Sequence, residues 1–307
     1  MDADTFQNLT IGEIARLVRQ DGQKVCVFPI NGTRRWFFLE HLPRPGENWL
    51  PSYMDVAAQN HLGLYRLFFD YGLDTLLTPI FGPDLLERGG SYMHAFGEGL
   101  ARIAAHPDFI GFYDAYKVRV RFYGDHRQYF DGTPYAHLSD LFEEATERTK
   151  DHDGHRLFFG VCAHDAMETV ARLSVRYHAE HGRVPDKRTL VTLYYGEYVE
   201  PVDLFIGFDK FSAFDMPLVA TGNEDLYFTV CPSPYLTQQQ LRDILYDHLY
   251  CRRGGEPQYE AMETEQWEYM RAFYTVNRGK TLGVGVKREQ IWYPSQQIDL
   301  PTDCEGL

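Results

Sequence analysis

The segment "VFPINGTRRWFF" (residues 27–38) combines residue types that suit the binding of a phosphate beside an apolar group. Gly32 permits a tight turn, and Thr33 can cap a helix whose first backbone N–H groups attract anions. Arg34 and Arg35 add two forked cationic donors that match phosphate oxygens. We therefore expect this segment to hold a diphosphate. Two arginines on a solvated helix face are the alternative interpretation.

The neighbours of this turn raise two further expectations. Trp36 and Phe37 follow the arginines and predict an apolar pocket for the rest of the ligand. Asn31 stands where a carboxylate would serve as a general base or a metal ligand. Its amide oxygen can ligate Mg²⁺ or a magnesium-bound water, but it carries no charge and cannot serve as a general base. Asn31 is therefore a candidate catalytic residue and a weak candidate metal ligand.

The elements that must position these residues follow a regular order. Short apolar runs alternate with helical patterns, which predicts an α/β fold with a central, mostly parallel six-stranded sheet flanked by helices. Helical spacing and capping residues predict helices over 53–71, after Asp165 and after Thr237. Ligands of such sheets collect at the carboxyl ends of the strands, where residues 31–35 lie. The expected strands cover residues 24–30, 75–81, 117–124, 156–162, 202–208 and 226–230.

The remaining segments predict a simple domain organisation. We expect one domain over residues 1–307, because neither an internal repeat nor a low-complexity linker interrupts the pattern. The polar residues 145–155 are expected to form an exposed loop. Residues 290–307 show no periodicity and predict an extended C-terminal tail.

Composition excludes several classes of function. The chain has 30 Lys and Arg residues against 44 Asp and Glu residues, and its formal net charge is −14. A nucleic-acid binder needs a basic face, which this sequence lacks, so a local pair of arginines is informative. Five scattered cysteines without CxxC spacing predict reduced thiols. No signal peptide or bilayer-spanning run is visible, so we expect a cytoplasmic protein.

The sequence resembles a known family at several blocks in the same order. "KVCVFPINGTRRWF", "VRVRFYGD", "DLFIGF" and "EDLYFT" are similar to conserved blocks of the cis-prenyltransferases of the undecaprenyl diphosphate synthase type. The longer blocks "LYYGEYVEPVDLFIGFDKFSAFDMPL" and "LYFTVCPSPYLTQQQLRDILYDHLYCR" resemble one branch of that fold, the tuberculosinol/kolavelool type of diterpene synthase. The resemblance covers most of the chain.

This resemblance implies a reaction and its participants. Members of the branch ionise a bicyclic C20 prenyl diphosphate, and an upstream class II diterpene cyclase supplies that substrate. Water then captures the allylic cation and gives a diterpene alcohol, while some members transfer the diterpenyl group to adenosine. Mg²⁺ is the implied cofactor, and the fold usually forms homodimers.

The resemblance also assigns roles to individual residues. Arg34 and Arg35 would hold the diphosphate. Tyr53 and Tyr92 match active-site tyrosines, whose hydroxyls are expected near the allylic carbon or the attacking water; core tyrosines are the alternative. Asn31 falls on the family's catalytic aspartate. Either the native protein works without this carboxylate, or the chain is an Asp→Asn replacement, or it binds prenyl diphosphates without turning them over.

One departure from the family pattern bears on the choice of reaction. Chain-elongating members have two further arginines after the strand that matches "DLFI". Gly207 takes the place of the first, and Lys210 is the nearest cation to the second. Because a lysine does not replace a bidentate arginine, a second diphosphate site and cis-prenyl elongation are disfavoured. Lys210 is expected to assist the arginines at the first site.

Overall fold

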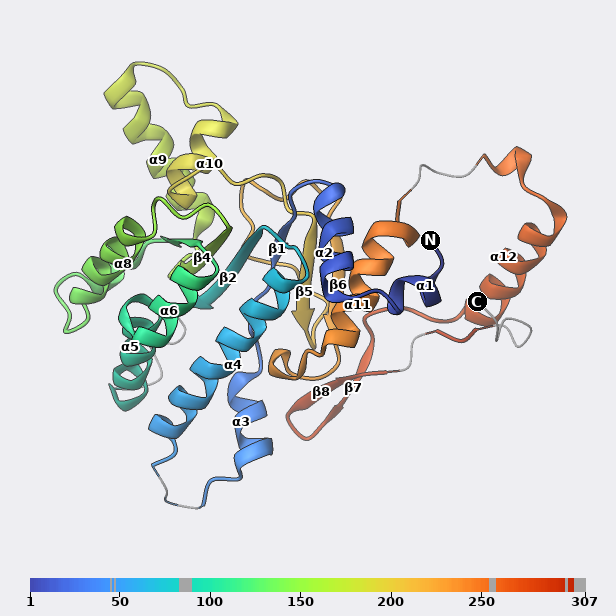
Figure 1. Ribbon diagram of the computed structural model, residues 1–307, viewed down its shortest axis with the longest axis horizontal. Helices are drawn as coiled ribbons and strands as arrows, with labels where there is room; N and C mark the ends of the chain where they lie inside the picture. The colour runs from blue at the N-terminus through green and yellow to red at the C-terminus, as the bar shows by residue number, and fades with distance from the viewer. Residues whose placement is uncertain (45, 47, 83–89, 254–257, 296–297, 301–307) are drawn as a thin grey trace.

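A six-stranded sheet forms the centre of the protein (Figure 1). The structure is a computed structural model that describes residues 1–44, 46, 48–82, 90–253, 258–295 and 298–300. The strand order is β3-β4-β2-β1-β5-β6, and every neighbouring pair is parallel. This confirms the predicted fold class. The strands are β1 (Val25–Val27), β2 (Thr75–Phe81), β3 (Val118–Tyr123), β4 (His155–Val161), β5 (Leu204–Phe208) and β6 (Asp225–Thr229).

Helices cover both faces of the sheet. Cys26 lies in one buried cluster with residues of α2, α4, α6 and α11, whereas Val25 and Val27 lie in another with residues of α10. This alternation is the period of two that a strand imposes on its side chains. The helices are α1 (Ala3–Gln7), α2 (Ile11–Gln20), α3 (Thr33–His41), α4 (Leu50–Asp70), α5 (Gly90–Ala105), α6 (Pro107–Ala115), α7 (His126–Phe130), α8 (His137–Arg148), α9 (Ala166–His181), α10 (Lys187–Tyr195), α11 (Gln238–Tyr246) and α12 (Thr264–Asn277).

The predicted helix starts are close to the observed ones. Thr237 and Gln240 form a complete capping box at α11, and the side chain of Asp165 accepts the backbone N–H of Glu168 at α9. Helix α4 begins at Leu50, earlier than the expected residue 53. Its first turn contains a proline, which is tolerated there because backbone N–H groups of the first turn have no partner within the helix.

The structure corrects the expected loop at 145–155 and adds a strand at the start of the expected tail. Residues 145–148 continue α8, and Thr149 is buried, where its hydroxyl accepts the Val120 N–H at 3.0 Å. The side chain thus ties the helix end to β3. At the C-terminus, β8 (Ile291–Pro294) pairs antiparallel with β7 (Gly285–Arg288), so the tail begins with a hairpin strand.

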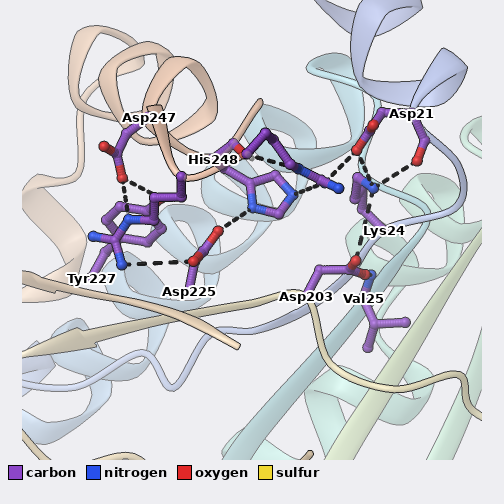
Figure 2. A network of polar contacts seen from close by, with 10 residues as sticks. Asp21, Lys24, Val25, Asp203, Asp225, Tyr227, Asp247 and His248 are labelled. Atoms are coloured by element: carbon purple, nitrogen blue, oxygen red, sulfur yellow. Dashed lines mark hydrogen bonds and ion pairs between the residues drawn. The ribbon is translucent and has the colours of Figure 1, made fainter. Parts of the chain in front are cut away.

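Charged side chains bind one another at the amino ends of β1, β5 and β6 (Figure 2). Lys24 is 3% exposed, and its Nζ lies 2.7 Å from an oxygen of Asp21 and 3.8 Å from one of Asp203. Asp203 also accepts the Val25 N–H at 2.8 Å. A buried charge loses its hydration, and here the ion pairs and hydrogen bonds with neighbouring residues compensate for that loss. The charged groups at this end of the sheet are therefore bound to one another and are not available for a ligand.

The C-terminal segment extends away from this core. In Figure 1, α12 lies at the opposite side of the molecule from α8 and α9, and none of its residues is buried. The β7–β8 hairpin lies between α12 and the site described below. None of the described helices combines the length and apolarity needed to cross a membrane.

Candidate functional site

The turn after β1 is fixed by contacts with the segment that follows β6. The Asn31 N–H donates to the Ser233 hydroxyl at 3.1 Å, and the Ser233 N–H donates to the Asn31 carbonyl at 3.0 Å. Gly32 has φ 74°, and an added Cβ would lie 2.8 Å from the Phe208 ring and 2.9 Å from Pro232. Only glycine meets both the backbone and the space requirement, so the turn holds its shape without a ligand.

Thr33 and Tyr53 join this turn to α4. Their hydroxyl oxygens are 2.7 Å apart, and Tyr53 is buried. Phe37, one turn further along α3, packs edge-on against Tyr53 with ring centroids 5.4 Å apart. Trp36 packs against the same cluster. The two aromatics that were expected in the ligand pocket thus support Tyr53 from the side of α3.

An apolar cavity opens beside this hydroxyl pair, between α4, α5 and the end of β2. Its volume is about 100 Å³. The carboxyl end of β1 contributes Ile30, and Thr33 and Tyr53 form part of the wall. The remaining lining residues are Met54, Ala57, Ala58, His61, Ile80, Phe96, Gly99, Leu100, Ile103 and Phe109. The cavity therefore lies between the sheet and α4, next to the turn that carries the two arginines.

His61 is a functional candidate that the sequence reasoning missed. Its Nε2 atom is buried and has no hydrogen-bond partner among the described residues. Burial lowers the pKa of His61 to about 4, so the imidazole is neutral at pH 7. A neutral, unpartnered ring nitrogen at an apolar cavity can accept a proton or hold one water. Helical spacing alone places Tyr53, Ala57 and His61 on one face of α4, which is the signal that was available.

The side chains of Arg34 and Arg35 lie on the solvent-exposed side of the turn. Arg34 is exposed and has no ion-pair partner among the described residues. The Arg35 Nη1 lies 3.5 Å from the Asp209 carboxylate, and its guanidinium lies 5.2 Å from the centre of the Phe208 ring. Arg35 is thus held in place at the carboxyl ends of β1 and β5, while Arg34 is free to follow a ligand.

A second cavity, of about 740 Å³ and with both charged and aromatic side chains in its lining, adjoins Arg35. On the side of β5 it is lined by Asp209, Lys210, Phe211 and Ser212. The hairpin supplies the opposite wall with Lys287, Gln290, Ile291 and Trp292. Lys210 and Lys287 form no ion pair within the part of the chain that the structure describes. Cations without a carboxylate partner keep their attraction for an anionic ligand.

Gly207 lies where the resemblance places an arginine of the chain-elongating members. A Cβ at this position would lie 2.8 Å from the ring of Phe205 and 2.9 Å from the ring of Phe228. A side chain longer than that of glycine would therefore displace these rings.

Tyr92 and a Mg²⁺ site are the remaining expectations about this edge of the sheet. Tyr92 belongs to the first turn of α5, but its side chain lies outside the described residues. No group of three or more His, Cys, Asp or Glu side chains among the described residues is arranged to hold a metal ion. Asn31 brings an amide oxygen and Asp209 a carboxylate to this edge. Mg²⁺, which keeps several waters and binds through substrate phosphates, fits such a sparse donor set.

Sequence comparisons find relatives that span nearly the whole chain. A tuberculosinyl adenosine transferase of Mycobacterium tuberculosis is 40% identical over 290 residues, which is 94% of this chain and 96% of that protein. A (+)-kolavelool synthase of Herpetosiphon aurantiacus is 24% identical over 282 residues, 90% of this chain and 91% of that protein. No protein-family model matches the chain.

Comparison with solved structures identifies the fold. A lavandulyl diphosphate synthase from Lavandula x intermedia, in complex with dimethylallyl diphosphate, superimposes with a TM-score of 0.58 at 16% identity, over 76% of this chain and 97% of that chain. A probable undecaprenyl diphosphate synthase from Campylobacter jejuni gives a TM-score of 0.56 at 15% identity, over 75% and 97%. Together with the 40% identical relative, these matches establish that the chain belongs to the family of tuberculosinyl adenosine transferase, built on the cis-prenyltransferase fold.

Proposed function

We propose that this enzyme ionises a bicyclic C20 prenyl diphosphate of the clerodane (kolavenyl) or halimane (tuberculosinyl) type, and that water captures the allylic cation to give a diterpene alcohol and diphosphate. The observation that carries the proposal is the meeting of an apolar cavity with a cationic edge at Thr33. A substrate with a greasy body and a charged head would place its scissile C–O bond at this boundary. In the same proposal an upstream class II diterpene cyclase supplies the substrate, and the protein works as a cytoplasmic homodimer.

The cationic edge would stabilise the leaving group. When the C–O bond breaks, its electron pair leaves with the diphosphate, whose negative charge increases. Arg34, Arg35 and the first N–H groups of α3 supply donors for these oxygens, and Lys210 adds a cation. Mg²⁺ bound to the diphosphate, with the Asn31 amide oxygen as its ligand from the protein, would add Lewis-acid stabilisation of the same charge.

The cavity would control the cation. Its apolar walls exclude bulk water, so the capture step is left to a water held by polar groups at the wall. His61 Nε2 and the Thr33–Tyr53 hydroxyl pair are the described groups suited to that task. The water oxygen forms the new C–O bond, and its proton passes to His61 Nε2 and then to solvent. Tyr92 enters this proposal through the family resemblance alone.

The size of the cavity adds a requirement. A volume of about 100 Å³ holds only part of a C20 body, since pockets for such ligands usually exceed roughly 300 Å³. We expect α4 and α5 to separate when substrate enters. Gly99 faces Met54 at this interface, where an added Cβ would lie 3.2 Å from the sulfur, so the helices approach closely and have a flexible side chain to displace.

Transfer of the diterpenyl group to adenosine is the second candidate. It is favoured by 40% identity to a tuberculosinyl adenosine transferase and by a cavity of about 740 Å³ next to Arg35, which is far larger than a water requires. Chain elongation is disfavoured by the lack of space for a side chain at Gly207.

Product analysis tests these alternatives directly. The protein is incubated with a panel of bicyclic C20 diphosphates, with and without Mg²⁺ and adenosine, and diphosphate and terpenoid products are measured. A hydroxylated diterpene supports the main proposal, and an adenosine adduct supports the second. Absence of diphosphate release with every substrate would contradict both, and tight binding that turns over only in Asn31→Asp would indicate a carrier. Incorporation of labelled isopentenyl diphosphate would instead establish elongation.

A further inference from the structure

The short segment after β6, residues 232–236, contacts all three elements that carry the proposed site. It contains a single 3₁₀ turn, Ser233–Tyr235. Its hydrogen bonds reach the turn after β1, helix α3 and helix α4. None of its residues lines the apolar cavity or the cavity beside Arg35. The contacts of this segment therefore concern the placement of other residues and not the lining of a cavity.

Ser233 holds the start of α3. This residue is buried, and its hydroxyl accepts the Asn31 N–H at 3.1 Å and donates to the Pro29 carbonyl at 3.3 Å. Its own N–H donates to the Asn31 carbonyl at 3.0 Å. Three hydrogen bonds from one residue thus fix the backbone directly before the first turn of α3. That turn carries Arg34 and Arg35, so the placement of both cations depends on these bonds.

Tyr235 holds the other end of the same helix through Glu40. The Tyr235 hydroxyl donates to the Glu40 carboxylate, and this bond raises the pKa of Tyr235 to about 12, so the hydroxyl keeps its proton at neutral pH. A carboxylate in the last turn of a helix is disfavoured by the helix dipole, and its charge opposes an anion bound at the first turn. The bond to Tyr235 gives this unfavourable carboxylate a role, which is to hold the helix.

The same segment is tied to α4 beside His61. The Asn60 side-chain amide donates to the Pro234 carbonyl at 3.3 Å. Asn60 directly precedes His61, which lines the apolar cavity. The carbonyl that lies between Ser233 and Tyr235 in the chain therefore holds α4 next to the proposed proton acceptor. Hydrogen bonds from one short segment thus join the cationic edge to the wall of the cavity.

We propose that residues 232–236 hold the two parts of the site in register, with Ser233 and Tyr235 as positioning residues. The inference rests on the proposed ionisation of a prenyl diphosphate. Donors to a departing diphosphate act best when they are in place before the C–O bond breaks, and a displacement on the order of 1 Å can lower a rate about 100-fold. If α3 is released at either end, Arg34 and Arg35 can move away from the leaving oxygens.

Kinetics and calorimetry with the full chain test Tyr235. Tyr235→Phe removes only the hydroxyl, and Tyr116→Phe is the matched control, because the Tyr116 hydroxyl donates to the carboxylate of Asp70 at 2.9 Å, at the far end of α4. In Tyr235→Phe we expect inorganic pyrophosphate to bind about threefold more weakly. The kcat for diphosphate release should fall further, about tenfold, because the charge on the leaving group is larger in the transition state than in bound substrate. Glu40→Gln keeps an acceptor for Tyr235 and should retain the wild-type kcat.

The number of pyrophosphate sites per chain separates positioning from stability. Weaker pyrophosphate binding and lower kcat in Tyr235→Phe, with an unchanged number of sites and wild-type values in Tyr116→Phe, support the inference. Wild-type pyrophosphate affinity in Tyr235→Phe overturns it, whether or not the wild type turns over a substrate. A loss of sites that accounts for the lower kcat, or an equal loss in Tyr116→Phe, also overturns it, because the hydroxyl would then serve stability alone. The ionisation proposal fails by a different result, the absence of diphosphate release by the wild type with every substrate.

Discussion

The two ends of the central sheet carry similar charged residues in opposite states. At the amino end, Lys24 lies between Asp21 and Asp203, and other charges around it are paired in the same way (Figure 2). At the carboxyl end, Arg34 and Lys210 have no acidic partner among the described residues. A charge that finds its partner inside the protein contributes to folding. A cation left without one keeps its attraction for a ligand.

His248 and His61, each with a buried Nε2 atom or ring, show the same contrast. His248 Nδ1 lies 2.6 Å from Asp225, and its Nε2 lies 3.2 Å from Arg253. Because arginine only donates, Nε2 accepts and Nδ1 carries the proton that is donated to Asp225. Burial lowers the pKa of His248, as it does for His61, but the Nε2 of His61 has no partner. One ring is committed to structure, and the other has a free acceptor at a cavity.

Loss of an arginine at the carboxyl end is expected to have the largest effect. Arg34→Ala should lower kcat/KM for the diphosphate substrate by about 10²- to 10³-fold, because a cationic donor without a partner among the described residues, available to the departing oxygens, is removed. The comparison is Arg252→Ala at the amino end, where the guanidinium is paired with Asp225 and Asp247. We expect that variant to keep its kcat/KM. Equal losses of activity in the two variants would remove the functional distinction between the ends.

Loss of a cation at the amino end should affect stability instead. Lys24→Met leaves Asp21 and Asp203 without their shared partner, and we expect the free energy of unfolding to fall by about 2–3 kcal/mol. Denaturant unfolding measures this change. Lys150→Met, which removes an exposed lysine, is the control and should unfold at the wild-type denaturant concentration. A large loss of kcat/KM in correctly folded Lys24→Met would argue against the assignment of this end to structure.

The histidine pair gives the next largest effect. His61→Ala is expected to lower the rate of alcohol formation about 100-fold, the usual contribution of a general base, while diphosphate binding is retained. Because the pKa of His61 lies at about 4, the wild-type rate should be flat above roughly pH 5 and fall as the imidazole is protonated below it. His248→Ala should lose stability and keep its rate. Wild-type product rates in His61→Ala would exclude this histidine from the capture step.

The fold was predictable from the sequence because its signals are local. Buried parallel strands have continuous apolar sequences. Thr237 and Gln240 mark the start of a helix within four residues. The glycine turn after β1 was predictable for the same reason, since Gly32 and the arginines are adjacent. The hairpin was not, because its turn carries Glu289 and Gln290, without the glycine or asparagine that usually marks such turns.

The details of the site depend on contacts between distant segments. Trp36 and Phe37 are next to the arginines in sequence, yet the rotation of α3 directs them toward Trp49 and Tyr53. In the sequence, His61 is an ordinary polar residue of a helix. Its place at a cavity wall depends on α5, whose residues line the same cavity. The cavity beside Arg35 joins residues far apart in the sequence, such as Lys210 and Gln290, which are about 80 positions apart. No local pattern encodes such a meeting, which arises only when the chain is folded.

Replacement of Asn31 should have the smallest effect on rate. It tests whether the cations at the carboxyl end of the sheet suffice for the reaction without a carboxylate beside them. Hydrogen bonds to Ser233 from the Asn31 backbone fix the turn, so Asn31→Asp changes charge without changing shape. If the unpaired cations suffice for the leaving group, kcat/KM at saturating Mg²⁺ should change less than about threefold. The Mg²⁺ concentration for half-maximal rate should fall, because a carboxylate binds the ion more tightly than an amide. Asn223→Asp, in an exposed loop, controls for the added charge. A rate increase of 100-fold or more would instead show that the carboxyl end lacks a group that its chemistry needs, and that unpaired cations alone do not make this end functional.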